Sequence, residues 1–200
     1  MADLQQAREK GDGRGEKLPM NRRPNSSMTV LMTTDTVGGV WNYCIQLAEA
    51  LRGYSVQIAR ATMGPAMNEP QREQVRRLSN VQLYESTFKL EWMQRPWEDV
   101  DRAGRWLLSL DRQLRPDLVH LNGYAHAALP WSCPVLVVAH SCVCSWFEAV
   151  RRCEPTLEWQ EYRRRVRLGL RQADRVTAPT AAAHRARQFE EYVRKLMIVD

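Results

Sequence analysis

The sequence has no long apolar run. No stretch approaches the ~20 consecutive apolar residues that a membrane-spanning helix requires. Residues 1–27 are polar and mixed in charge, without the apolar core of a secretory signal, and they predict a disordered leader. These absences argue against a transmembrane or secreted protein. They predict a cytoplasmic chain and leave open peripheral attachment to the inner membrane face.

Cysteine is present, but not at the spacing of a metal or dithiol site. The five cysteines are Cys44, Cys133, Cys142, Cys144 and Cys153, and no pair forms a C-x-x-C motif. The C-x-C pair formed by Cys142 and Cys144 is only a weak metal signal. We therefore predict reduced thiols and no bound metal.

Motifs of several enzyme and binding classes are also missing. There is no G-x-S-x-G nucleophile elbow and no paired acid and base typical of a glycosidase. The net charge of +6 favours anionic partners, and arginines gather at 163–171. That helix face has no interleaved exposed aromatics or nucleic-acid motif, so we interpret it as a solvated surface and predict no nucleic acid partner.

From Thr29 onwards, short apolar runs alternate with helical patterns. Strands are expected at 29–34, 55–61, 81–84, 117–121, 135–139 and 175–178. Helices are expected at 39–51, 96–114, 124–129, 157–171 and 181–196, and 140–155 is expected to be a loop or broken helix. Strands separated by helices indicate a parallel sheet with right-handed crossovers. The pattern predicts one α/β domain over 28–196, a Rossmann-like, doubly wound parallel sheet.

The turn after the first strand is the first candidate site. Its sequence, D-T-V-G-G-V-W over 35–41, places Gly38, Gly39 and Trp41 at the start of a helix. Adjacent glycines allow a ligand to approach the backbone, and free N–H groups at a helix start favour a phosphate or a polarised hydroxyl. A plain tight turn is the alternative.

Two further candidates follow later strands. His140 ends the most apolar strand, and Asn122 and Tyr124 lie just past the strand before it. In open α/β sheets, ligands bind at the carboxyl edge, so we expect Gly38, Gly39, Asn122 and His140 to converge in one pocket. His140 could hydrogen-bond a sugar hydroxyl or act as a donor to a developing negative charge; a structural histidine is the alternative.

Three segments resemble glycosyltransferase family 4. They are MTVLMTTDTVGGVWNYCIQLAEAL, RPDLVHLNGYAHAALPWSCPVLVVAHSCVCSW and ADRVTAPT, and the resemblance covers about 28–190. It implies the GT-B arrangement, in which two Rossmann-like domains face each other across a cleft. The N-terminal domain binds the acceptor, the C-terminal domain binds a nucleotide sugar, and transfer retains the anomeric configuration without a metal or other cofactor.

The resemblance also implies roles for particular residues. Gly38 and Gly39 would lie beside the donor phosphates or the reacting hydroxyls, and His140 would contact the sugar near the reaction centre. The acceptor would be a saccharide, a lipid or a small molecule. The family's donor-binding domain, with its paired glutamates, has no counterpart before Asp200. We therefore expect a fragment, a truncated product or one half of a split enzyme that is inactive alone.

Two alternatives remain from the sequence. A nicotinamide-dependent oxidoreductase should carry G-x-G-x-x-G, which the turn at 35–41 lacks. A non-catalytic module that keeps only the acceptor pocket is the second. Nucleotide sugars and nicotinamide cofactors, tested for their effect on thermal stability, would separate a glycosyltransferase domain from an oxidoreductase.

Overall fold

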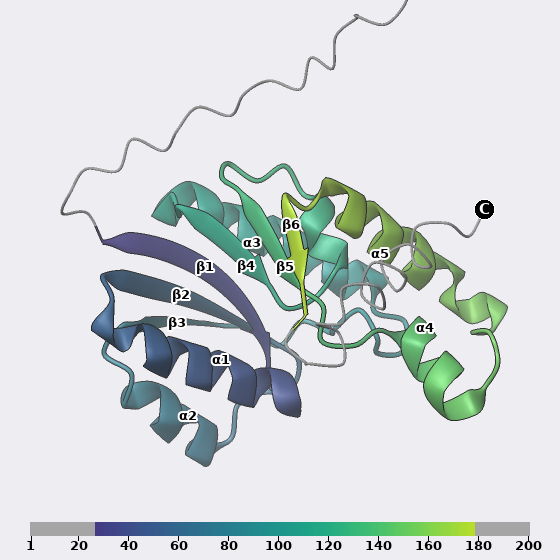
Figure 1. Cartoon of the computed structure of the whole chain (residues 1–200), viewed down its shortest axis with the longest axis horizontal. Coiled ribbons are helices and arrows are strands. Elements are labelled where there is room, and N and C mark those ends of the chain that lie inside the picture. The colour runs from purple at the N-terminus through teal and green to yellow at the C-terminus, as the bar shows by residue number, and fades with distance from the viewer. Residues whose placement is uncertain (1–26, 179–200) are drawn as a thin grey trace, which may run out of the picture.

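The computed structural model describes residues 27–178, which form one six-stranded, all-parallel sheet with helices on both faces (Figure 1). The strands are β1 (Met28–Asp35), β2 (Val56–Met63), β3 (Val81–Glu85), β4 (Leu118–Leu121), β5 (Val135–Val138) and β6 (Arg175–Thr177). Their order across the sheet is β3-β2-β1-β4-β5-β6. This confirms the Rossmann-like, doubly wound sheet: successive strands are added on one side of β1 as far as β3 and on its other side from β4 onwards, so the strand order switches between β1 and β4.

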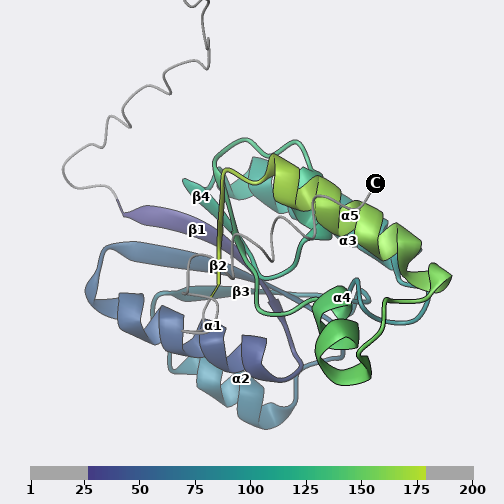
Figure 2. The same ribbon diagram turned by 45° about the vertical axis from the view of Figure 1, so that its right-hand side comes forward.

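Helices and short turns connect the strands. They are α1 (Gly39–Ala50), η1 (Leu51–Gly53), α2 (Glu69–Arg76), α3 (Trp97–Leu114), η2 (Ala125–Ala128), α4 (Val143–Trp146), the π-helical η3 (Phe147–Arg151), η4 (Leu157–Trp159) and α5 (Gln160–Gln172). Figures 1 and 2 show α1 and α2 on one face of the sheet and α3 and α5 on the other. None of the helices within 27–178 has both the length and the apolar composition needed to span a bilayer.

The strand side chains alternate between two cores because successive residues of a strand point to opposite faces. Leu31 and Val119 face α3 and α5, where Leu107 and Val166 cover them. Met32 faces α1, where it packs with Cys44. Truncating a fully buried leucine such as Leu107 typically costs about 2–5 kcal/mol, so these layers hold the strand ends in place.

Most expected elements are present, with shifted ends. The second strand runs two residues further than expected, to Met63, and the helix expected from 157 opens with the 3₁₀ turn η4 before α5. Arg115 ends α3 in the left-handed conformation, with φ of 47°, directly before Pro116. The leader expected at 1–27 lies, except for residue 27, outside the described residues, as does the helix expected at 181–196.

Helix α2 is the main element that the apolar pattern does not predict. Val75 is its only buried residue, so it shows no apolar stripe. Its start is defined instead by a capping box: the Asn68 side chain accepts from the Gln71 N–H at 2.9 Å, and the Gln71 side chain accepts from the Asn68 N–H at 3.0 Å.

Candidate functional site

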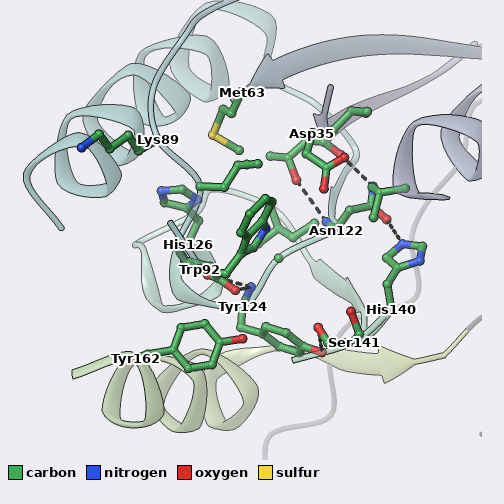
Figure 3. Close-up of a pocket in the computed structure, with 17 residues that line it drawn as sticks. Asp35, Met63, Lys89, Trp92, Asn122, Tyr124, His126, His140, Ser141 and Tyr162 are labelled. Carbon is green, nitrogen blue, oxygen red and sulfur yellow. Dashed lines mark hydrogen bonds between the residues drawn. The ribbon is translucent and has the colours of Figure 1, made fainter. Parts of the chain in front are cut away.

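A pocket opens at the carboxyl edge of β1, β4 and β5, next to the point between β1 and β4 where the strand order switches (Figure 3). Its lining combines polar groups from the strand ends with apolar and aromatic side chains from the segment before α3. The lining residues that matter most below are Asp35, Glu91, Trp92, Asn122, Tyr124 and His140. A concave site with a few convergent polar groups at this edge is the expected ligand site of an open α/β sheet.

Asn122 and His140 are brought together directly. The His140 Nε2 atom lies 2.7 Å from Asn122 Oδ1, and the two side chains point towards each other across the strand ends (Figure 3). Burial lowers the pKa of His140, so the ring is neutral near pH 7. The Tyr43 ring meets the imidazole edge-on, with 4.8 Å between ring centroids, and helps to hold its orientation.

The glycine turn borders the pocket without lining it. Asp35 and Val40, on either side of the turn, are lining residues, whereas Gly38 and Gly39 are not. Gly38 has φ of 68°, a conformation that favours glycine, and no side chain caps the start of α1. A Cβ atom at Gly38 or Gly39 would meet nothing within 4 Å, so the space in front of the turn is open.

Trp41 is not brought into the pocket. Its side chain is 3% exposed, and its indole Nε1 donates a hydrogen bond to Gln74 Oε1 at 2.6 Å. The other side of the ring is covered by Arg60, whose guanidinium carbon lies 3.9 Å from the ring centroid. The structure therefore gives Trp41 a packing role between α1 and α2, in place of the substrate contact expected from the sequence.

Tyr124 lines the pocket but is largely committed to the protein. The side chain is buried, and its hydroxyl donates to the Ser141 carbonyl oxygen at 3.1 Å. His126, a further histidine near the same edge, places Nε2 2.9 Å from the Val100 carbonyl oxygen and so packs onto α3. Tyr124 thus contributes mainly to the shape of the pocket wall, because its hydroxyl is already hydrogen-bonded within the protein.

Glu91 is a pocket residue that the sequence does not reveal. Its carboxylate accepts the N–H groups of Tyr124 at 3.1 Å and Ala125 at 2.7 Å, at the start of η2. Burial raises the pKa of Glu91, and these two hydrogen bonds oppose the rise. Both oxygens serve the backbone, so Glu91 positions the segment that follows Asn122. Nothing in the local sequence at 86–95 signals this long-range contact.

Asp35 and Trp92 are also missing from the residues singled out by sequence. Burial raises the pKa of Asp35 to about 6, while the Val37 N–H and the Arg60 charge oppose the rise. Trp92 is 43% exposed on the pocket wall. Asp35 ends a strand at the ligand edge, a signal that sequence reasoning could have used; Trp92 lies in an irregular segment without such a signal.

The sequence matches the model of glycosyltransferase family 4 over residues 37–188. This segment is more than half of the 200 residues and contains the glycine turn, Asn122 and His140. The chain belongs to glycosyltransferase family 4. The match supports a glycosyltransferase over the oxidoreductase alternative.

Two solved structures are similar to part of this chain. One is MurG of Acinetobacter baumannii, with a TM-score of 0.41 and 17% identity over 58% of this chain and 36% of that one. Another is Phytolacca americana UGT2, complexed with UDP-2-fluoro-glucose and pterostilbene, with a TM-score of 0.44 and 14% identity over 62% of this chain and 33% of that one. This family 4 chain therefore spans about a third of their lengths. No curated protein matches it.

Proposed function

We propose that this family 4 domain is the N-terminal, acceptor-side half of a retaining glycosyltransferase that uses a nucleotide sugar. The observation that supports this most directly is the Asn122–His140 pair, joined at 2.7 Å inside the pocket at the carboxyl edge of the sheet. Family membership supplies the reaction class, and the pocket supplies a place for a hydroxyl-bearing acceptor. The acceptor is a saccharide, a lipid or a small molecule.

His140 is the proposed catalytic residue, in contact with the sugar near the reaction centre. It follows β5 and is half-buried, so water around it is limited and a hydrogen bond there is stronger than in bulk solvent. Asn122 lies beside it as a substrate-binding residue and holds the ring. Asp35, at the end of the neighbouring β1, adds a third polar group to the same wall.

The glycine turn is proposed to receive the donor phosphates or the reacting hydroxyls. Gly38 needs glycine for its backbone conformation, but Gly39 does not: its φ is not positive and a Cβ would meet nothing. The missing side chain at Gly39 leaves the backbone open to a ligand beside the pocket. The uncapped N–H groups at the start of α1 can then donate to that ligand.

A second, donor-binding half is required for turnover in this proposal. Transfer needs groups that hold the leaving diphosphate, and the family places them in its C-terminal domain. We expect the 200-residue chain alone to transfer no sugar, and a separate or attached C-terminal half to be its partner. We also propose a cytoplasmic location, with which the lack of a disulfide among the five cysteines, all within residues 27–178, is consistent.

The test uses this domain joined to the donor domain of a family 4 relative. We expect His140→Ala to lower kcat by about 10²-fold while changing the melting temperature little, because the side chain contacts the reacting sugar and not the core. Gly39→Val should block the ligand sterically and keep the fold. Gly53→Val is the matched control, because a Cβ at Gly53 also meets nothing within 4 Å, at the far end of α1.

Unchanged turnover in His140→Ala would contradict the assigned role. Equal losses in Gly39→Val and Gly53→Val would show that the glycine turn has no special function. A joined protein that binds an acceptor but never transfers sugar would favour the non-catalytic module. The anomeric configuration of the product, read by NMR, decides whether transfer is retaining.

A further inference from the structure

The Asn122 side chain has its amide orientation fixed by β1. The Asn122 Nδ2 atom lies 2.7 Å from the Thr33 carbonyl oxygen and 3.2 Å from Cys44 Sγ, while the Asn122 N–H donates to Thr33 Oγ1 at 3.0 Å. A carbonyl oxygen can only accept, so the amide NH₂ group must face it. The reversed amide would place two oxygens 2.7 Å apart without a proton between them.

This orientation determines which atom faces His140. With Nδ2 directed at Thr33, Oδ1 lies 2.7 Å from His140 Nε2, and Oδ1 has no proton to donate. The hydrogen bond therefore requires a proton on Nε2. Burial lowers the pKa of His140, so the ring is neutral near pH 7 and has one proton. Its other nitrogen, Nδ1, then has a free lone pair.

We infer that Asn122 is a positioning residue that fixes His140 as the Nε2–H tautomer, so that the imidazole presents a hydrogen-bond acceptor, Nδ1, to the ligand. Among the described residues Nδ1 has no hydrogen-bond partner, and it is not one of the fully buried unpartnered atoms. It therefore retains contact with solvent, and the His140 residue lines the pocket.

A second neutral histidine, His120, lies on β4 two residues before Asn122, and its Nε2 atom is buried without a hydrogen-bond partner. Burial lowers the pKa of His120 to about 4, so His120 is also neutral. The tautomer of His140 is thus set within an uncharged group of side chains.

The inference specifies the ligand group at His140 and, in this respect, rests on the proposed function. A neutral ring whose only proton is used by Asn122 binds a hydroxyl that donates to Nδ1. It does not bind a carbonyl or an ionised phosphate oxygen, which only accept. The sequence leaves His140 as a donor to developing charge or as a partner of a sugar hydroxyl; the Asn122 contact selects the hydroxyl partner.

The tautomer can be measured on the full 200-residue chain without any substrate. Long-range ¹H–¹⁵N correlation spectra of histidine-labelled protein at about pH 7.5, where unperturbed histidine is neutral, distinguish Nε2–H from Nδ1–H rings. We expect the Nε2–H pattern for His140. His126 is an internal reference, because its Nε2 lies 2.9 Å from the Val100 carbonyl oxygen and needs the same tautomer without Asn122.

Asn122→Ala should convert His140 to a mixture of tautomers and leave His126 unchanged. Asn122→Asp has nearly the same shape, and the carboxyl oxygen that replaces Nδ2 must be protonated to face the Thr33 carbonyl oxygen. Its other oxygen remains an acceptor for Nε2–H, so His140 should keep its tautomer in this variant and lose it in Asn122→Ala. An Nδ1–H pattern in the unmodified chain, or a His140 pattern indifferent to both substitutions, overturns the inference.

The outcome is separable from that of the proposed function. The spectra require no sugar transfer, so the tautomer can be confirmed even if His140→Ala leaves turnover in the joined enzyme unchanged, in which case only the proposed function fails. If His140→Ala abolishes turnover and the tautomer is Nδ1–H, the catalytic role stands and the positioning role of Asn122 fails.

Discussion

Replacing Asp35 by asparagine should stabilise the protein at neutral pH. Asp35 ends β1 on the pocket wall, and burial raises its pKa to about 6, while the Val37 N–H at 3.2 Å and the Arg60 charge only partly oppose the rise. The usual pKa of an aspartate is about 3.9. Because the folded pKa lies above the unfolded one, the folded state binds the proton more tightly. The contribution of Asp35 to stability is therefore most favourable below about pH 4 and is lost as the pH rises through about 6.

The size of the effect follows from the pKa difference. A rise of about two units corresponds to about 3 kcal/mol at 1.36 kcal/mol per unit, and the remaining solvent contact of Asp35 reduces this to about 1–2 kcal/mol. Asparagine has the same shape and its side-chain oxygen can still accept from Val37. We expect Asp35→Asn to raise the free energy of unfolding by about 1–2 kcal/mol at pH 8 and by almost nothing near pH 4.

Urea unfolding at the two pH values measures this difference, and Glu161→Gln is a control of opposite sign. The hydrogen bond from Arg164 is the main cause that lowers the pKa of Glu161 to about 2, and Arg165 contributes as well. The ionised Glu161 thus contributes stability above the unfolded pKa, and this is lost as the pH falls. Glu161→Gln should destabilise slightly at pH 8. Destabilisation by Asp35→Asn at pH 8, or an equal effect at both pH values, would refute the reasoning.

Two further predictions concern packing and acceptor binding. Gly169→Ala should destabilise the fold by about 3 kcal/mol or more, because a Cβ there overlaps the Tyr124 carbonyl oxygen. Gly53→Ala is the control and should change stability little, because a Cβ at Gly53 meets open space. Thermal unfolding compares the two variants, and similar melting temperatures would contradict the prediction. Trp92→Ala should raise the acceptor KM of the joined enzyme by about 10-fold, since the half-exposed indole lies on the pocket wall. Trp146 is similarly exposed, at 46%, but does not line the pocket, so an equal effect of Trp146→Ala would argue against an acceptor contact by Trp92.

The sheet could be predicted from the sequence because its signals are local. The runs at β1 and β5 are apolar and β-branched, and strands buried on both faces need such runs whatever surrounds them. Helix α2 has one buried residue, so only its capping box at Asn68 could have indicated it. A search based on apolar periodicity does not detect this kind of helix.

Only those parts of the candidate site that follow from the strand topology could be predicted from the sequence. Asn122 and His140 each follow a strand, and the carboxyl ends of parallel strands share an edge, so their meeting follows from the fold class. The orientation of the Trp41 side chain does not follow from the fold class, because a residue in the first turn of a helix can face the ligand or the sheet. Glu91 reaches the Tyr124 N–H from an irregular segment, and no local pattern encodes that contact.

The link from Thr33 through Asn122 to His140 bears on how this domain can be diversified. The imidazole takes its orientation from Asn122, which follows β4 and is held by Thr33 of β1, and from Tyr43 of α1, not from the segment that follows β5. Exposed positions of segments 141–156 and 86–96 can therefore be varied to select for new acceptors while the imidazole stays in place, provided that Glu91 and the buried Leu90 and Cys142 are kept. A library built on this scaffold should also hold Thr33, Tyr43, Cys44 and Asn122 constant.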